Sequence, residues 1–177
     1  KPWQMWALTA PGIASYSICD DKSAATFSDL LGDYQGVVVC DALSTHGAGA
    51  HENPRIQLAG CWAHVFRKFD EAKLNFPVAE EALALIGELY AIDAKADGDV
   101  GRLGELRRSQ APPLLARLHD WLMQHAGDTH ISIGKAARYA LTIWDRLIRF
   151  VDEPRIPLDN NATERAIRGP VVGRKNH

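Results

Sequence analysis

Two acidic residues, far apart in the chain, carry the candidate chemistry. Asp41 follows the apolar run Gly36-Val-Val-Val-Cys40, and ligands of mixed sheets gather at the carboxyl ends of such buried strands. Glu164 lies 123 positions later, in the polar segment 157–177. Carboxylates that meet from distant positions can hold a divalent cation such as Mg²⁺. An alternative stays open for each residue, since Asp41 could form a turn and Glu164 could cap a helix.

Amide and cationic side chains surround Glu164 in the sequence. The candidate phosphate-binding residues are Asn160, Asn161, Arg165, Arg168, Arg174 and Lys175. From residue 138 to residue 177 there are eight Lys or Arg against five Asp or Glu, whereas the whole chain has a formal charge of -2. This asymmetry predicts a phosphate-bearing partner for the C-terminal part. The alternative is a solvated helix face on which Arg168 pairs with Glu164.

Three further candidates lie near the middle of the chain. His64, Arg67 and Lys68 occur in the run Cys61-Trp-Ala-His-Val-Phe-Arg-Lys-Phe69. This run predicts a helix with Trp62, Val65, Phe66 and Phe69 facing inward and both cations facing out. His64 could lie near a site, but we favour a core histidine. The three cysteines are odd in number and lie in apolar contexts, which favours reduced core thiols over a zinc site.

The elements that must position these residues change character along the chain. Up to about residue 67 the sequence predicts short strands and helices, namely a hairpin from Trp3–Thr9 and Ile13–Cys19, a helix ending at Gly32, and strands at Gly36–Cys40 and Ile56–Cys61. From Pro77 the apolar spacing is helical. Within this stretch Pro112-Pro113 predicts the first turn of a helix, and an apolar stripe from Ala136 to Val151 predicts another.

A last helix is predicted around Glu164. Asn161 and Glu164 have the spacing of a capping box, so the helix should begin near Ala162. Gly169-Pro170 is the predicted end. If this helix packs back on the strands, Asp41 and Glu164 can meet.

Several sequence words, in order along the chain, resemble a known family. They are Tyr34-Gln-Gly-Val-Val-Val-Cys-Asp41, the run from Cys61 to Phe69, Glu88-Leu-Tyr-Ala-Ile92, Lys135-Ala-Ala-Arg-Tyr-Ala-Leu141, Leu158-Asp-Asn-Asn-Ala-Thr-Glu-Arg-Ala-Ile-Arg168 and Gly173-Arg-Lys-Asn176. Together they are similar to the transposase of bacterial insertion sequences of the insertion sequence 66 type, from about Gly32 onward. The chain departs from that pattern in two respects. Ala-Leu-Ser-Thr-His follows Asp41, where the family more often has a Gly-Tyr pair, and the chain stops at His177, before the family's C-terminal portion.

The resemblance implies a DDE transposase with an α/β, ribonuclease-H-like mixed sheet and a large helical insertion. Asp41 would be the second acid of the triad and Glu164 the third, and the two would bind Mg²⁺ or Mn²⁺, with two ions in the complete enzyme. The first aspartate would precede Lys1, so we expect a fragment that is inactive alone. Residues 1–70 and 153–177 would belong to the catalytic core, and residues 71–152 would form the insertion.

The implied partners are DNA, at insertion-sequence ends and target sites, and further copies of the protein in a DNA complex. The absence of a long apolar run predicts no membrane span, and we expect a bacterial cytoplasmic protein. Two alternatives remain open: a ribonuclease-H-like nuclease or resolvase that cuts without joining, and a DNA-binding module without catalysis.

Overall fold

The computed structural model describes residues 3–42, 48–50, 53–127 and 131–175. For residues 169–175 it describes the backbone alone. The fold is mixed α/β. It divides into two compact units, which we describe separately. The sheet unit comprises Lys1–Leu58 and Asp159–His177, and the helical unit comprises Ala59–Leu158.

The sheet unit begins with the predicted hairpin. Strands β1 (Gln4–Ala10) and β2 (Ile13–Cys19) pair antiparallel, with Ala10 opposite Ile13. Gly12 in the turn has φ 77°, a value that glycine adopts without the steric penalty other residues incur and that type II turns require after proline. The hairpin prediction is therefore confirmed.

Helix α1 (Ala24–Leu31) follows, and the Ser23 side chain caps it by accepting a hydrogen bond from the Thr26 amide. Next come strands β3 (Gly36–Cys40) and β4 (Ile56–Gly60), which form a second two-stranded sheet. The core of this unit is small, and its buried members are Phe27, Cys40, Ile56 and Leu58. Only Cys40 of β3 is buried, whereas Gly36–Val39 are half-buried, so this strand is less enclosed than its apolar sequence predicts.

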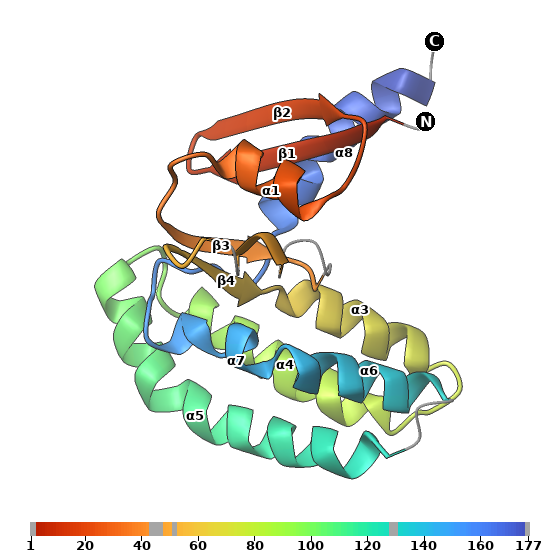
Figure 1. Ribbon diagram of the computed structural model, residues 1–177. Helices are drawn as coiled ribbons and strands as arrows, with labels where there is room; N and C mark the ends of the chain where they lie inside the picture. Colours follow the sequence, from red (N-terminus) through yellow and green to blue (C-terminus); the bar gives the residue numbers. More distant parts are fainter. Residues whose placement is uncertain (1–2, 43–47, 51–52, 128–130, 176–177) are drawn as a thin grey trace. The chain divides into compact units, whose positions relative to one another are not determined.

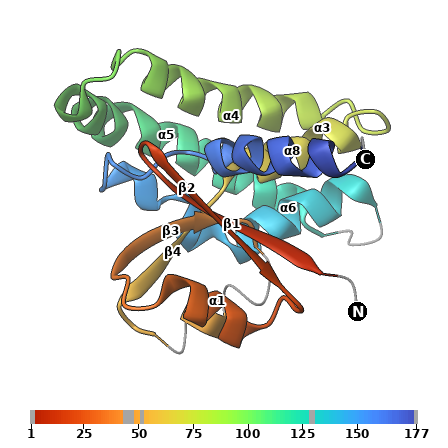
Figure 2. The ribbon, with the colours of Figure 1, turned by 90° about the horizontal axis from the view of Figure 1, so that it is seen from above.

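Helix α8 (Asn161–Lys175) completes the sheet unit and packs along β1 (Figure 1; Figure 2). The helix begins at Asn161 and passes through Gly169-Pro170, so the predicted end was wrong. Proline has no amide hydrogen to donate to the carbonyl four residues earlier, which here is that of Ala166. The Tyr16 hydroxyl of β2 donates to that carbonyl at 3.0 Å and thereby replaces the lost bond.

The helical unit contains four main helices: α3 (Trp62–Ala72), α4 (Ala79–Ala94), α5 (Val100–His125) and α6 (Ser132–Thr142). Each of them packs against two of the others, α3 and α5 both contacting α4 and α6. The short helix α7 (Trp144–Leu147) and a 3-10 turn (Arg149–Val151) follow. The apolar stripe that ends at Val151 is thus divided among three elements, with a break at buried Ile143.

Two further details of the helical unit differ from expectation. Pro112 and Pro113 lie inside α5 rather than at a helix start. Each proline removes a backbone hydrogen bond of the helix. The burial of Ala111 and Leu115 on either side of the prolines offsets this loss, because packing supplies most of the stability of a helix. Phe66 was predicted to face inward, yet it is 36% exposed, while Trp62, Val65 and Phe69 fill the inward face of α3.

Trp62 lies at the centre of the helical unit and is fully buried. Its indole Nε1 donates to the Leu147 carbonyl at 3.0 Å, and its amide donates to the Leu158 carbonyl at 2.9 Å. Its ring makes edge-to-face contacts with Trp144 and Phe150. These contacts hold the end of the unit, residues 144–158, against the start of α3.

A ribonuclease-H-like sheet and a helical insertion at residues 71–152 stay predictions. Within the described ranges, the four strands form two separate pairs. Helix α3 packs with α4 and α6 and therefore belongs to the helical unit.

Candidate functional site

Asp41 directly follows β3 and is half-buried. The residue before it, Cys40, is buried in the core of the sheet unit, so the backbone that carries Asp41 is anchored by packing. The strand that precedes Asp41 was predicted correctly. Residues 43–47, which contain His46, lie outside the described part of the chain.

Glu164 lies in the first turn of α8 and is also half-buried. Its amide donates to the Asn160 carbonyl at 3.1 Å, the first bond of the helix. Asp41 and Glu164 therefore belong to the same compact unit, although most of the residues between them form the other unit. That their carboxylates share a metal ion stays a prediction.

Asp159, which the sequence reading did not single out, organises the start of α8. Its two carboxylate oxygens accept from the amide and from the side-chain Nδ2 of Asn161, at 2.9 and 2.8 Å. Asn161 was expected to be the capping residue, but it is the first residue of the helix. An aspartate whose side chain accepts from the amide two residues later forms an Asx-turn, and aspartate was present at this position in the sequence.

Two contacts fix α8 against the hairpin. The Thr163 hydroxyl lies 2.5 Å from that of Thr9 on β1, and the Tyr16 hydroxyl binds the Ala166 carbonyl. Thr163 and Ala166 are three residues apart and thus share one face of the helix. The face that packs on the hairpin therefore carries small side chains, and no simple periodicity in the sequence identifies it.

Arg165 and Arg168 are exposed and lie three residues apart on α8, so they share a helix face. Arg174 and Lys175 continue the same helix, but their side chains lie outside the description. Cations near the C-terminal end of a helix are favoured by its dipole. The phosphate-binding role of these residues stays a prediction.

The other three candidates lie in the helical unit, on α3. His64 is half-buried, and its Nδ1 lies 3.5 Å from Nη2 of Arg67. Arg67 and Lys68 are exposed, as predicted, and the Lys68 Nζ lies 4.5 Å from the centre of the Tyr139 ring. These residues belong to a different unit from Asp41 and Glu164.

Cys19, Cys40 and Cys61 form no disulfide in the part of the chain that the structure describes. Cys40 and Cys61 are buried, as expected of core cysteines, whereas Cys19 is half-buried. Among the residues that the structure describes, no three His, Cys, Asp or Glu side chains are grouped closely enough to hold a metal ion. None of the described helices combines the length and apolar character required to span a membrane.

The sequence model of the Transposase IS66 family matches residues 1–177. The chain belongs to this family. The match begins at Lys1, so the family resemblance also covers the β1–β2 hairpin, which lies before the words that first indicated it.

Relatives within this IS66 family include uncharacterized proteins of Sinorhizobium fredii (strain NBRC 101917 / NGR234). Protein y4qI is 31% identical over 179 residues, which cover 95% of this chain and 33% of the relative. Protein y4jD is 29% identical over 182 residues, covering 97% of this chain and 35% of the relative. The chain thus spans about a third of the length of the relatives it matches. No solved structure gives a significant match.

Proposed function

We propose that this chain is part of a DDE transposase that cuts and joins DNA at insertion-sequence ends, with Asp41 and Glu164 as the second and third acids of its triad. One structural observation carries the proposal. Both carboxylates are half-buried in one compact unit, at the end of a strand and in the first turn of a helix, although 123 positions separate them. Membership in the IS66 family supports it.

The donor chemistry fits Mg²⁺ or Mn²⁺, because both ions prefer carboxylate oxygen ligands. When bound, a pair of such ions activates the attacking oxygen and stabilises the leaving oxygen of a phosphodiester. Asp41 would supply a carboxylate ligand from the end of β3, and Glu164 would supply one from the first turn of α8. Two carboxylates are too few to hold two ions, so a third acid is required, and the resemblance expects it on a strand that precedes β1.

The cations of α8 would bind the DNA itself. Arg165 and Arg168 present their guanidinium groups on an exposed helix face, where each can donate two parallel hydrogen bonds to a phosphate. Such contacts fix the position of the duplex without reading its sequence. Their place one to four residues after Glu164 would set the phosphate backbone beside the acids.

The test is an Asp41→Asn and a Glu164→Gln variant of the whole protein, assayed for Mg²⁺-dependent cleavage of duplex insertion-sequence ends. Each variant should lose at least about 10²–10³-fold in rate, as when a contact made in the transition state is removed. Asp33→Asn is the matched control, because Asp33 is an exposed acid of the same unit. Cleavage by either variant at the rate of the control would refute the assignment of that residue.

A second assay distinguishes a transposase from a nuclease of the same fold. A pre-cleaved element end, mixed with a target duplex, should be joined to that target by the wild-type protein. Cleavage without joining would favour the nuclease or resolvase reading. The 177-residue chain alone should show little cleavage in either assay, because it supplies two of the three acids, and robust cleavage by it would contradict that count.

A further inference from the structure

The four main helices of the helical unit differ sharply in charge. Helix α4 carries Glu80, Glu81, Glu88 and Asp93 and no Lys or Arg, whereas α6 carries Lys135 and Arg138 and no Asp or Glu. Because α3 and α5 each pack against both of these helices, α4 and α6 occupy opposite corners of the bundle. The bundle therefore has an acidic corner and a basic corner.

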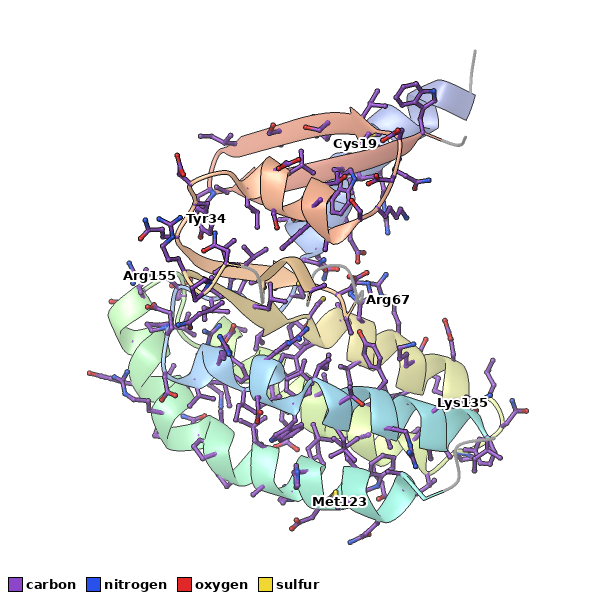
Figure 3. All side chains as sticks on the ribbon, viewed as in Figure 1. Cys19, Tyr34, Arg67, Met123, Lys135 and Arg155 are labelled. Carbon is purple, nitrogen blue, oxygen red and sulfur yellow. The ribbon has the colours of Figure 1, made fainter. Side chains whose placement is uncertain are left out.

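Helix α3 extends the basic corner. Lys68 lies with its Nζ 4.5 Å from the centre of the Tyr139 ring on α6, so the cations of the two helices adjoin. Arg67 is its neighbour, and Figure 3 shows Arg67 on α3 and Lys135 on α6 with their side chains directed outward. We define the cationic surface as Arg67, Lys68, Lys135 and Arg138, all of which are exposed.

The two arginines of this surface are held by backbone contacts. The Arg67 Nε donates to the Ala63 carbonyl at 3.2 Å, and the Arg138 Nη2 donates to the Ala126 carbonyl at 3.2 Å. A guanidinium group that is held in place loses less side-chain entropy when it binds an anion. Of the acids on α3, Asp70 is paired with Lys73 at 2.7 Å, and Glu71 is exposed.

We propose that the cationic surface binds the backbone phosphates of duplex DNA, as a second contact besides the cations of α8. The inference rests on the proposed function, which supplies DNA as the partner. With a net charge of -2, the chain as a whole has no bulk attraction to DNA, so local clusters must provide it. The acidic α4 corner would repel the duplex and so fix which side of the bundle faces it.

The experiment compares two double variants of the whole protein that change the charge equally. Lys135→Gln with Arg138→Gln removes two cations of the cationic surface, and Arg102→Gln with Arg108→Gln removes two exposed cations of α5. Affinity for a short duplex of arbitrary sequence is measured at several salt concentrations. If both α6 cations contact phosphates, the slope of log affinity against log salt should fall in magnitude by about 1.8, at about 0.9 per contact. The α5 control should keep the wild-type slope.

Three outcomes would overturn the inference. Equal slopes for the α6 variant and the wild type would show that Lys135 and Arg138 do not contact DNA phosphates. If the slope of the α5 control fell by the same amount as that of the α6 variant, the effect would come from the net charge of the chain and not from the cationic surface. If the α6 variant kept the wild-type slope but had a smaller mass than the wild type in light scattering, the cationic surface would instead bind the acidic α4 helix of a second copy. Asp41→Asn separates this question from the proposed function, since it should slow cleavage by at least about 10²–10³-fold while keeping the wild-type slope. Cleavage by Asp41→Asn at the rate of Asp33→Asn would refute the catalytic role of Asp41 and leave the slope comparison intact.

Discussion

The two units of this chain differ in how they use their side chains. In the described part of the chain, the largest fully buried side chains all belong to the helical unit, among them Trp62, Phe69 and Leu118. The sheet unit has a small core, and on β2 it leaves Ile13 and Ile18 each 70% exposed. Apolar burial at about 25 cal/mol per Å² is the main stabilising term in folding. The helical unit is thus the better packed of the two, whereas the candidate acids lie in the less densely packed one.

The residues that stabilise the fold most are therefore separated along the chain from the residues of the proposed chemistry. The sheet unit holds α8 to the hairpin by specific hydrogen bonds, Thr9 to Thr163 and Tyr16 to Ala166. The helical unit depends on close packing and on the buried cation Arg107. Substitutions of buried residues in the helical unit should therefore cost more stability than substitutions of exposed residues in either unit.

The largest effect is expected for Arg107→Ala in the helical unit. Arg107 is 1% exposed, and its Nε and Nη2 donate to the Asp93 carboxylate at 2.8 and 2.5 Å. Its Nη1 donates to the carbonyls of Phe150, Pro154 and Ile156. Removing one partner of such a pair should lower the free energy of unfolding by about 3–5 kcal/mol, measured by chemical denaturation.

Arg108→Ala is the control for Arg107, because Arg108 is the exposed neighbour on α5. It should change the free energy of unfolding by no more than about 0.5 kcal/mol. Similar losses for the two variants would contradict the view that Arg107 ties α4 and α5 to the segment 150–156.

A second test measures how tightly the helical unit is packed. A Cβ atom on Gly60 would lie 2.8 Å from Cδ2 and 3.3 Å from the backbone nitrogen of Leu147, which is itself buried. Gly60→Ala should therefore destabilise by about 1–3 kcal/mol through overpacking. Gly87→Ala is the matched control, because Gly87 is exposed in the middle of α4 and a Cβ there meets nothing within 4 Å. It should stabilise by up to about 1 kcal/mol, and a Tm change of the same sign in both variants would count against this account.

In the sheet unit, Tyr16→Phe should have a smaller and more local effect. The substitution removes the donor to the Ala166 carbonyl, which the proline four residues later cannot satisfy. Because Tyr16 is 44% exposed, water can partly replace the hydroxyl, and the cost should be at the low end of about 0.5–1.5 kcal/mol. Hydrogen exchange should quicken in α8 near Pro170 and stay unchanged in α5. Uniform exchange changes in both helices would show that the bond is not local to α8.

Tyr16 also shows why the sequence predicted only part of the molecule. Apolar periodicity and turn residues located the hairpin, α1, β3 and α3, and they predicted the helical character of α4, α5 and α6, because these signals are local. They did not give the division of the stripe from Ala136 to Val151 among three elements. The continuity of α5 through Pro112-Pro113 and of α8 through Pro170 depends on contacts with distant residues, which no local pattern contains.

For the candidate site, local sequence patterns also predicted only part of the structure. They correctly placed Asp41 at the end of a strand and Glu164 at the start of a helix. The capping role of Asp159, in contrast, was missed because Asn161 offered a competing capping signal.

The smallest effect on stability is expected for Glu153→Gln. Glu153 lies in the segment whose backbone carbonyls accept hydrogen bonds from Arg107. The hydrogen bond from Arg155 lowers the pKa of Glu153 to about 2, and the pair lies at the surface, with Arg155 79% exposed. A lowered pKa means that the carboxylate stabilises the folded state at pH values above its unfolded pKa of 4.5. That contribution is lost as the pH falls through about 2. Wild type should therefore have a Tm slightly above that of Glu153→Gln at neutral pH, and the difference should shrink as the pH falls from 4.5 to 2. A difference that widened over this interval would give the pair the opposite sign, and one as large as that of Arg107→Ala would remove the contrast between buried and exposed ion pairs in this loop.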